Sequence, residues 1–348
     1  MPHVTANFCR QERNESLADV PRYGDGPRQV RITHVLNPYR ARTEHERALQ
    51  ELTFETVRIA ARVAAPAIEV RCVCVTQPNE TGIVPPDFIA AETLTRTVLD
   101  VATFNVPRAM PLIFDVLDRG VGVIENPPEL SGCEDFIVFT NMDIHLQPYF
   151  YRVIAEFINA GYDMIDVHRR IIPHYAPTLD QLPSMFAESG LHHGGLDCIV
   201  FPRQKYQSFV KNHACIGMSL VMKGVLFNCA MQARRFLVLS NSRLTFHLGN
   251  DRAWSNPRFK DYENFNFSES IRVVSAISKD KAAAVKLISA LQPLGLRPEF
   301  IWTAKKVAGI ESPKLTPRQL VLRKIDSIRR RLVRKAHALI AGPESQEI

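Results

Sequence analysis

A strand–helix–strand pattern near the start of the chain constrains the fold more than any other segment. Residues 30–36 (VRITHVL) form an apolar run that ends at Asn37-Pro38, and residues 68–75 form a second such run. Between them, residues 45–64 place apolar side chains at helical spacing. A strand, a helix and a strand at this spacing form a βαβ unit, which predicts a parallel sheet.

The rest of the chain continues the alternation of strands and helices. The continuous apolar run at residues 136–139 is typical of a central strand that is buried on both faces. Residues 214–231 are nearly apolar, but Lys223 interrupts them, so a core helix is expected rather than a membrane span. Further strands are expected at residues 163–167, 196–201, 236–239 and 244–248, and further helices at 108–118, 149–160, 279–291 and 317–340. The predicted fold class is α/β, with a mixed, mostly parallel sheet flanked by helices.

Composition and charge indicate a large folded domain and a basic C-terminal tail. The chain has 348 residues, of which 46% are hydrophobic, and this suits one large domain with an appendage. Residues 301–340 hold eleven basic and two acidic side chains, a balance of +9, so the rest of the chain carries about −2 of the net +7. The basic character therefore belongs to the C-terminal tail, which disfavours nucleic acid as a partner.

The cysteines and the N-terminus predict a cytoplasmic location. The seven cysteines form no C-x-x-C pair and no zinc-type spacing, so buried free thiols in a reducing compartment are expected. The polar first residues lack the apolar stretch of a signal peptide.

Polar residues follow the central strand abruptly at Thr140. Ligands of α/β sheets bind beyond the carboxyl ends of the strands. Asn141 and Asp143 are two residues apart, so both can face one ligand there. A carboxylate at this place can hold a divalent cation that bridges two phosphates. The structural alternative is a polar turn in which Asp143 caps a helix.

Four segments resemble one protein family. They are ITHVLNPYR at 32–40, FTNMDIHLQPYFY at 139–151, GGLDCIVFPRQKY at 194–206 and LTFHLGNDRAW at 244–254. In this order they resemble a bacterial group of GT-A-like glycosyltransferases. The resemblance implies a GT-A-like domain at 28–268, between a polar leader at 1–27 and a helical extension at 269–348. It also implies transfer of a sugar from a nucleoside-diphosphate sugar to a glycan or a lipid-linked acceptor.

The resemblance assigns roles to residues that follow the predicted strands at 30–36 and 136–139. Asn37 and Arg40 would approach the nucleotide, and Asn141 and Asp143 would meet the ribose and a cation, Mn²⁺ or Mg²⁺. The family pattern usually begins with Asp, whereas this chain has Asn141. An amide brings no charge, so only Asp143 supplies a carboxylate, and a low or absent metal affinity is one expectation.

A second metal ligand is expected at His247. The segment from His247 to Trp254 resembles the H-x-x-G-x-x-K-P-W pattern of glycogenin-like transferases, although it is one residue shorter before the glycine. By this resemblance His247 binds the metal and Arg252 meets the diphosphate, for which the forked guanidinium is suited. The alternative is a buried histidine at a strand end and a solvated arginine.

Three further residues complete the candidate site. Asp197 follows two glycines and would act as general base on the acceptor hydroxyl, orient the donor sugar, or cap a tight turn. Asp115 lies on an apolar helical face, where it binds the edge of a nucleotide base or, as the preferred alternative, pairs with Arg119. Arg170, together with Arg169, follows a strand and would neutralise phosphates, or is surface charge.

The predicted basic helix at 317–340 has two interpretations. Its apolar side chains recur near a heptad spacing, with arginine and lysine on the other faces. It would dock at the inner face of an anionic membrane, where each basic residue contributes ~1 kcal/mol, or it would pack against protein.

Two rival functions are compatible with the same residues. A sugar nucleotidyltransferase usually has a glycine-rich loop after the first strand, and this chain reads NPYRARTEHE there. A non-catalytic binding protein derived from the GT-A fold would explain Asn141.

Overall fold

The computed structural model describes residues 29–123, 133–172, 175–249, 256–291, 294 and 298–310. The chain divides into two compact units, one up to Ala308 and one from Gly309 to Ile348. The elements named in the following paragraphs belong to the first unit. The predicted leader at 1–27 and the predicted basic helix at 317–340 lie outside the described residues.

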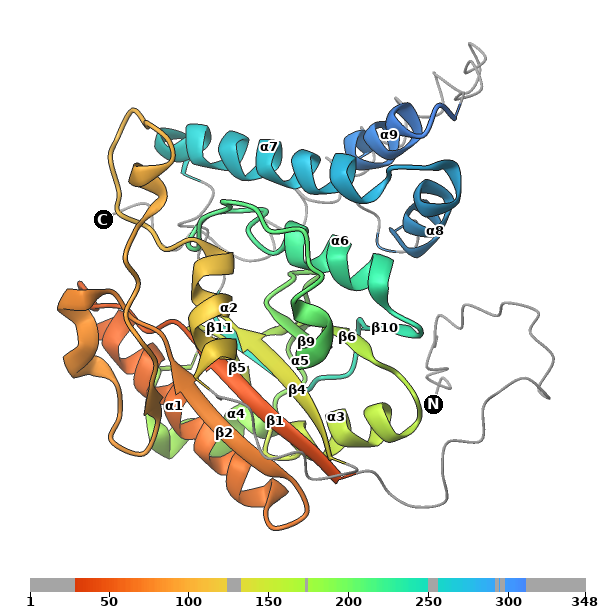
Figure 1. The fold of residues 1–348 in the computed structure, drawn as a ribbon. Helices are drawn as coiled ribbons and strands as arrows, with labels where there is room; N and C mark the ends of the chain where they lie inside the picture. The colour runs from red at the N-terminus through yellow and green to blue at the C-terminus, as the bar shows by residue number, and fades with distance from the viewer. Residues whose placement is uncertain are drawn as a thin grey trace. The chain divides into compact units, whose positions relative to one another are not determined.

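A seven-stranded sheet forms the centre of the first unit, in the order β10-β6-β9-β4-β1-β2-β3 (Figure 1). Neighbouring strands are parallel except at β9, which is antiparallel to both β4 and β6. The predicted fold class, an α/β fold with a mixed and mostly parallel sheet flanked by helices, is therefore confirmed. The strands are β1 Gln29–Leu36, β2 Glu69–Cys74, β3 Ile89–Ala90, β4 Cys133–Thr140, β6 Met164–Val167, β9 Cys198–Pro202 and β10 Phe236–Leu239.

Helices cover both faces of this sheet because its central strands are apolar on both sides. Helices α1 (Glu44–Ala64) and α3 (Phe150–Asn159) share one buried cluster with side chains of β1 and β4, such as Ile32 and Val138. Helices α2 (Ile113–Gly122), α5 (Arg203–Tyr206) and α6 (Lys223–Gln232) share the other, with Ile137 and Phe139. The alternation of Ile137, Val138 and Phe139 between the two clusters is the period-two pattern of a strand buried on both faces.

A second, four-stranded sheet has the order β5-β11-β7-β8. Strand β7 begins three residues after the end of β6, and β5 begins five residues after the end of β4, so this sheet lies at the carboxyl edge of the main sheet. Its apolar side chains pack with Leu52 of α1 and with Leu182 and Met185 of α4. The elements are β5 His145–Leu146, β7 Arg170–Ile172, β8 Leu191–His192, β11 Thr245–Leu248 and α4 Leu182–Ala187.

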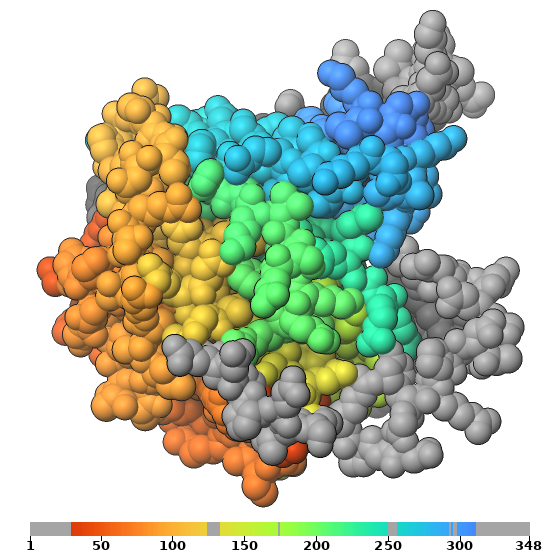
Figure 2. All heavy atoms as spheres, in the orientation of Figure 1, coloured from red at the N-terminus to blue at the C-terminus, as the bar shows by residue number. Residues whose placement is uncertain are grey.

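Three helices follow the sheets and belong to the same compact unit. They are α7 (Lys260–Ile277), α8 (Lys281–Leu291) and α9 (Pro298–Val307). In Figures 1 and 2, α7 and α8 lie along α6. Helix α7 runs through residue 268, where the sequence predicted the end of the catalytic domain.

Several predicted elements are shifted or differ. The helix expected at 108–118 begins only at Ile113, because Pro111 precedes it and Leu112 forms a bridge with Cys215. The core helix expected at 214–231 is shortened to α6, since Gly217 and Leu220 adopt positive φ before it. The strand expected at 244–248 is present as β11, but in the second sheet.

Other elements occur close to their predicted positions, as α8 does for 279–291. A search of the described residues finds no helix with the length and apolar character needed to cross a membrane.

Candidate active site

The candidate site lies where the carboxyl ends of β4 and β6 meet the start of β9. Because β9 is antiparallel to β4, its first residue, Cys198, pairs with Thr140 at the end of β4. The residues just outside this pair are Asn141 and Asp197, and the Asn141 N–H donates to the Asp197 carbonyl at 3.3 Å. Two segments 56 residues apart therefore place an amide and a carboxylate side by side.

Asp143 and His247 meet at the same edge. Asp143 Oδ2 lies 3.2 Å from His247 Nε2, and His247 Nδ1 lies 3.1 Å from the Gly249 carbonyl. The side chain of His247 is 4% exposed, whereas that of Asp143 is 42% exposed. The imidazole is thus buried, whereas part of the Asp143 side chain other than Oδ1 reaches solvent.

Asp197 is the centre of a second polar group. Its Oδ2 accepts from Arg169 at 2.7 Å, and its Oδ1 accepts from the Asn141 amide at 3.1 Å. Both side chains of the ion pair are largely buried. A Cβ at Gly195 would overlap the Asp197 carboxylate and crowd His193, so the glycine makes room for this arrangement.

The two carboxylates have opposite pKa shifts. Burial raises the pKa of Asp143, but the hydrogen bond and charge of His247 and the charge of Arg169 together hold it below its ordinary value. Burial, with the charge of Asp143, keeps the pKa of Asp197 above its ordinary value, although Arg169 lowers it. One carboxylate is therefore suited to stay ionised, and the other to accept a proton.

Asp143 and His247 supply part of a binding site for a divalent cation. Asp143 Oδ1 is buried without a hydrogen-bond partner among the described residues, so it is a carboxylate oxygen suited to a ligand. An oxygen and an imidazole nitrogen are both acceptable ligands for divalent first-row metals such as Mn²⁺. Within the described residues, no three His, Cys, Asp or Glu side chains form a metal-binding group. The remaining ligands would have to come from a substrate or from water.

The residues predicted at the first strand's edge are engaged with protein. Asn37 is 7% exposed and donates through Nδ2 to the Val75 carbonyl at 2.7 Å, which ties the ends of β1 and β2 together. Arg40 is exposed and donates to the Asn79 carbonyl at 3.1 Å. The amide group of Asn37 is thus used structurally.

The predicted salt bridge between Asp115 and Arg119 is wrong. Asp115 pairs through both oxygens with Arg96, at 2.6 and 2.8 Å, whereas Arg119 pairs with Glu92. The loop that carries Arg96 folds back beside α2, and no spacing along the helix could show this.

Arg170 is not beside Asp197. Its guanidinium donates to the backbone carbonyls of Met185, at 3.1 Å, and Glu188 at the end of α4. Arg169 takes the place beside Asp197 instead. The sequence identified the Arg169-Arg170 pair at a strand end but did not show which one faces the site. Arg252 lies outside the described residues.

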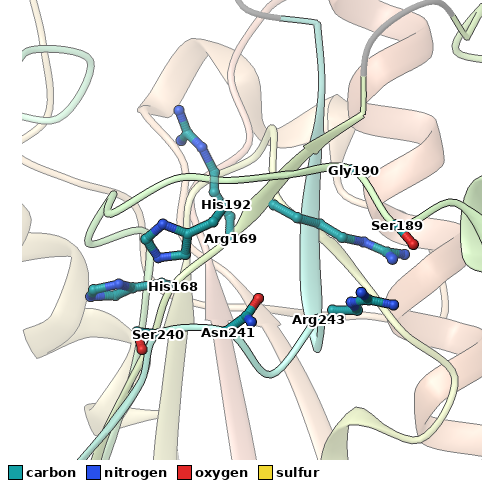
Figure 3. A pocket seen from close by; sticks show the side chains of 9 residues that line it. His168, Arg169, Ser189, Gly190, His192, Ser240, Asn241 and Arg243 are labelled. Atoms are coloured by element: carbon teal, nitrogen blue, oxygen red, sulfur yellow. The ribbon is translucent and has the colours of Figure 1, made fainter. Parts of the chain in front are cut away.

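A polar pocket adjoins Arg169 (Figure 3). The sequence identified the arginine pair but not the pocket, because its walls come from three separate segments. The lining residues are His168, Arg169, Arg170, Ser189, Gly190, His192, Ser240, Asn241 and Arg243. Figure 3 shows His168 and His192 on one side, and Ser189 and Arg243 on the other.

Comparison with known proteins finds similarity to solved structures alone. No family model matches the chain, and no curated protein matches it. Among solved structures it is similar to S. aureus TarS residues 1–349 in complex with UDP, with 13% identity, a TM-score of 0.46, and coverage of 91% of this chain and 94% of that one. The complex of the same protein with UDP-GlcNAc has 12% identity and a TM-score of 0.42, with coverage of 84% of this chain and 77% of that one.

A third similar structure is that of Rv0371c from Mycobacterium tuberculosis H37Rv, with 12% identity and a TM-score of 0.32. This similarity covers 69% of this chain and 98% of that one. All three TM-scores are below 0.5.

Proposed function

We propose that this protein is a GT-A-like glycosyltransferase that moves a sugar from a nucleoside-diphosphate sugar to a hydroxyl of a glycan or lipid-linked acceptor. The observation that carries the proposal is the meeting of Asp143 and His247 at the carboxyl edge of β4, with Asp197 beside Asn141. This edge is where α/β sheets bind nucleotides.

The donor would be bound through Asn141, Asp143 and His247. The amide of Asn141 has a buried Oδ1 without a hydrogen-bond partner among the described residues, which is suited to accept from a ribose hydroxyl. Asp143 and His247 would hold Mn²⁺ or Mg²⁺, and a bound cation would neutralise charge on the diphosphate. Because Asn141 is neutral, the protein depends on Asp143 for its carboxylate ligand.

Asp197 is the proposed general base. Its carboxylate would take the proton of the acceptor hydroxyl as the acceptor oxygen bonds to the anomeric carbon of the sugar. The bond from that carbon to the diphosphate breaks, and its electron pair leaves with the nucleoside diphosphate. Arg169 and Asn141 each donate to one Asp197 oxygen, so the acceptor hydroxyl would donate to a remaining lone pair or displace one of these contacts. Orientation of the donor sugar is the alternative role of Asp197.

A non-catalytic binding protein is the second candidate, and the neutral Asn141 favours it. A sugar nucleotidyltransferase is the third, and the absence of a glycine-rich loop after β1 in the sequence disfavours it. Peripheral binding to the inner face of the membrane through residues 317–340 belongs to the proposal and is based on the sequence alone.

Release of nucleoside diphosphate from uridine- and guanosine-diphosphate sugars tests the proposal. We expect slow hydrolysis with one donor, faster release with an acceptor, and loss of both in Asp143→Asn. The exposed Asp180 provides a matched control, since Asp180→Asn should leave the rate unchanged. Binding without release, even in Asn141→Asp, would favour the binding protein, and release of diphosphate from a nucleoside triphosphate would favour the nucleotidyltransferase.

A further inference from the structure

The pocket beside Arg169 is lined by basic and polar residues. Arginine, histidine, serine, asparagine and glycine line it, and no Asp or Glu is among its described lining residues. Three arginines line this small pocket: Arg169 pairs with Asp197, Arg170 donates to carbonyls at the end of α4, and Arg243 completes the set. Guanidinium groups recognise phosphate through such paired donors.

Three acidic residues near the pocket contact residues of its lining. Asp197 pairs with Arg169. Asp166 is 1% exposed and its Oδ2 lies 3.3 Å from His168 Nε2. The Glu188 carboxylate accepts from the Gly190 N–H at 3.1 Å. Each of these acids thus has a partner in the lining, whereas Arg243 makes no ion pair with any described residue.

Several side-chain nitrogen atoms around the pocket lack partners. His168 Nδ1, Arg169 Nε and Arg170 Nε are buried without a hydrogen-bond partner among the described residues. A buried donor without an acceptor costs free energy, and an anion bound nearby would offset this cost.

The backbone brings these side chains together at some conformational cost. Arg243 has φ 57, in the left-handed region that side-chain-bearing residues rarely adopt. Gly190 has φ 60, and a Cβ there would lie 2.6 Å from the Ile171 carbonyl oxygen. Glycine adopts this conformation without strain, whereas Arg243 is a strained position of the kind that clusters at ligand-binding sites.

We propose that this pocket binds a phosphate or phosphodiester group of the acceptor. The acceptor part of this inference rests on the proposed function, because it places the group next to Asp197, the candidate base. Arg169 is shared between the pocket and the base, so a phosphate bound there would draw Arg169 toward itself. This exchange is one way to free an Asp197 oxygen for the acceptor hydroxyl.

Calorimetric titration with inorganic phosphate and with glycerol phosphate tests the pocket, with and without saturating nucleoside diphosphate to fill the donor position. We expect Arg243→Gln to weaken phosphate binding about tenfold or more, as loss of a charge-assisted contact does. Asn241→Asp should weaken it too, because it adds a negative charge to the lining. Arg152→Gln, at an exposed arginine of α3 outside the pocket, should bind as the wild type does.

Acceptor assays then separate soluble from lipid-linked sources of the phosphate. Glycerol phosphate, a polyprenyl phosphate in detergent and a neutral polyol are offered in turn, and Arg243→Gln should raise KM for the phosphorylated acceptors alone. Absence of phosphate binding, or equal binding by wild type, Arg243→Gln and Asn241→Asp, would overturn the proposal. The protein could also bind phosphate, lose this binding in the two variants, and yet bind no nucleotide. That result would support the anion site and contradict the transferase, so the two failures are distinguishable.

Discussion

Asp143 Oδ2 lies 3.2 Å from His247 Nε2, although the two residues are 104 positions apart in the chain. Asp143 follows β4 of the main sheet, and His247 belongs to β11 of the second sheet. The contact therefore depends on the position of one sheet at the carboxyl edge of the other. In the proposed transferase the two side chains act as one unit on the donor diphosphate.

The first prediction concerns the coupling of these two residues. In the presence of Mn²⁺, Asp143→Asn and His247→Gln should each weaken nucleoside-diphosphate binding by about tenfold, because each removes a ligand of one cation. The double variant should bind no more weakly than the single variants, since residues that act as a unit are not additive. Titration calorimetry of the four proteins measures the coupling.

The control for this coupling is the same titration without Mn²⁺. The four proteins should then differ little, because the cation that links the pair to the diphosphate is absent. Additive losses that persist without the metal would show that the two residues act separately and not through a cation.

The second prediction concerns the pH dependence of the rate. Asp197 must be ionised to take a proton, and its raised pKa places the acid limb of the rate profile above the range of an ordinary Asp. Arg169→Gln removes a positive charge that lowers this pKa, so the acid limb should move to higher pH, whereas Arg169→Lys keeps the charge and should move it less. Asp197→Asn should lower kcat by about 10²–10⁴-fold.

An acid limb that stays in place in Arg169→Gln would contradict the role of Asp197 as base. A rate for Asp197→Asn equal to that of the wild type would contradict it as well. Nucleotide binding by both variants should stay close to the wild-type value, which excludes general unfolding as the cause.

The third prediction concerns stability and two buried histidines. His34 Nδ1 lies 2.6 Å from the Tyr151 hydroxyl and its Nε2 lies 2.8 Å from Thr140 Oγ1, while His145 Nδ1 lies 3.0 Å from Thr53 Oγ1. Burial lowers the pKa of each histidine to about 3.

The sign of the effect follows from proton binding. Below about pH 6.5 the unfolded chain binds protons at these histidines and the folded chain does not, so stability falls as pH falls from there toward about 3. Each histidine should contribute ~1.4 kcal/mol per pH unit to the slope of the unfolding free energy. Urea unfolding at pH 7.5, 6 and 5 measures this slope.

Variants separate the buried histidines from the others. His34→Gln should reduce the slope of the unfolding free energy against pH by the contribution of one bound proton. His45→Gln, at an exposed histidine of α1, should leave the slope unchanged. A slope that is the same in wild type and His34→Gln would contradict the buried, neutral state of His34.

The fourth prediction compares two glycines of α2. A Cβ at Gly120 would lie 2.5 and 2.6 Å from the two Cγ atoms of Val35 in β1, whereas a Cβ at Gly122 would meet nothing within 4 Å. Gly120→Ala should destabilise the protein by about 1–3 kcal/mol through overpacking. Gly122→Ala should be neutral or stabilise it by about 0.5 kcal/mol, since alanine favours helices. Thermal and urea unfolding of both variants check the difference.

The main strands and helices were predictable because their patterns are local. The continuous apolar runs in β1 and β4 indicate strands that are buried on both faces, and both strands occur where they were expected. The start of α2 was not predictable, since its position depends on the pairing of Leu112 with Cys215, about a hundred residues away. The second sheet escaped prediction because its strands β5, β7 and β8 are only two or three residues long.

The candidate site was predictable in its place but not in its contacts. Asp143 and His247 were expected to share a ligand, and the structure brings them together. Asp115, by contrast, pairs with Arg96, and Arg170 donates hydrogen bonds to backbone carbonyls at the end of α4. Which of two adjacent arginines turns toward Asp197 depends on the turn between β6 and β7, and sequence spacing does not determine that turn.

Titration of the full chain with uridine and guanosine diphosphates, with and without Mn²⁺, tests the central claim most directly. We predict that one of the two nucleotides binds, that Mn²⁺ strengthens its binding by about tenfold, and that Asp143→Asn abolishes this gain. Absence of binding by both nucleotides under both conditions would contradict the assignment of this site to a nucleoside-diphosphate sugar.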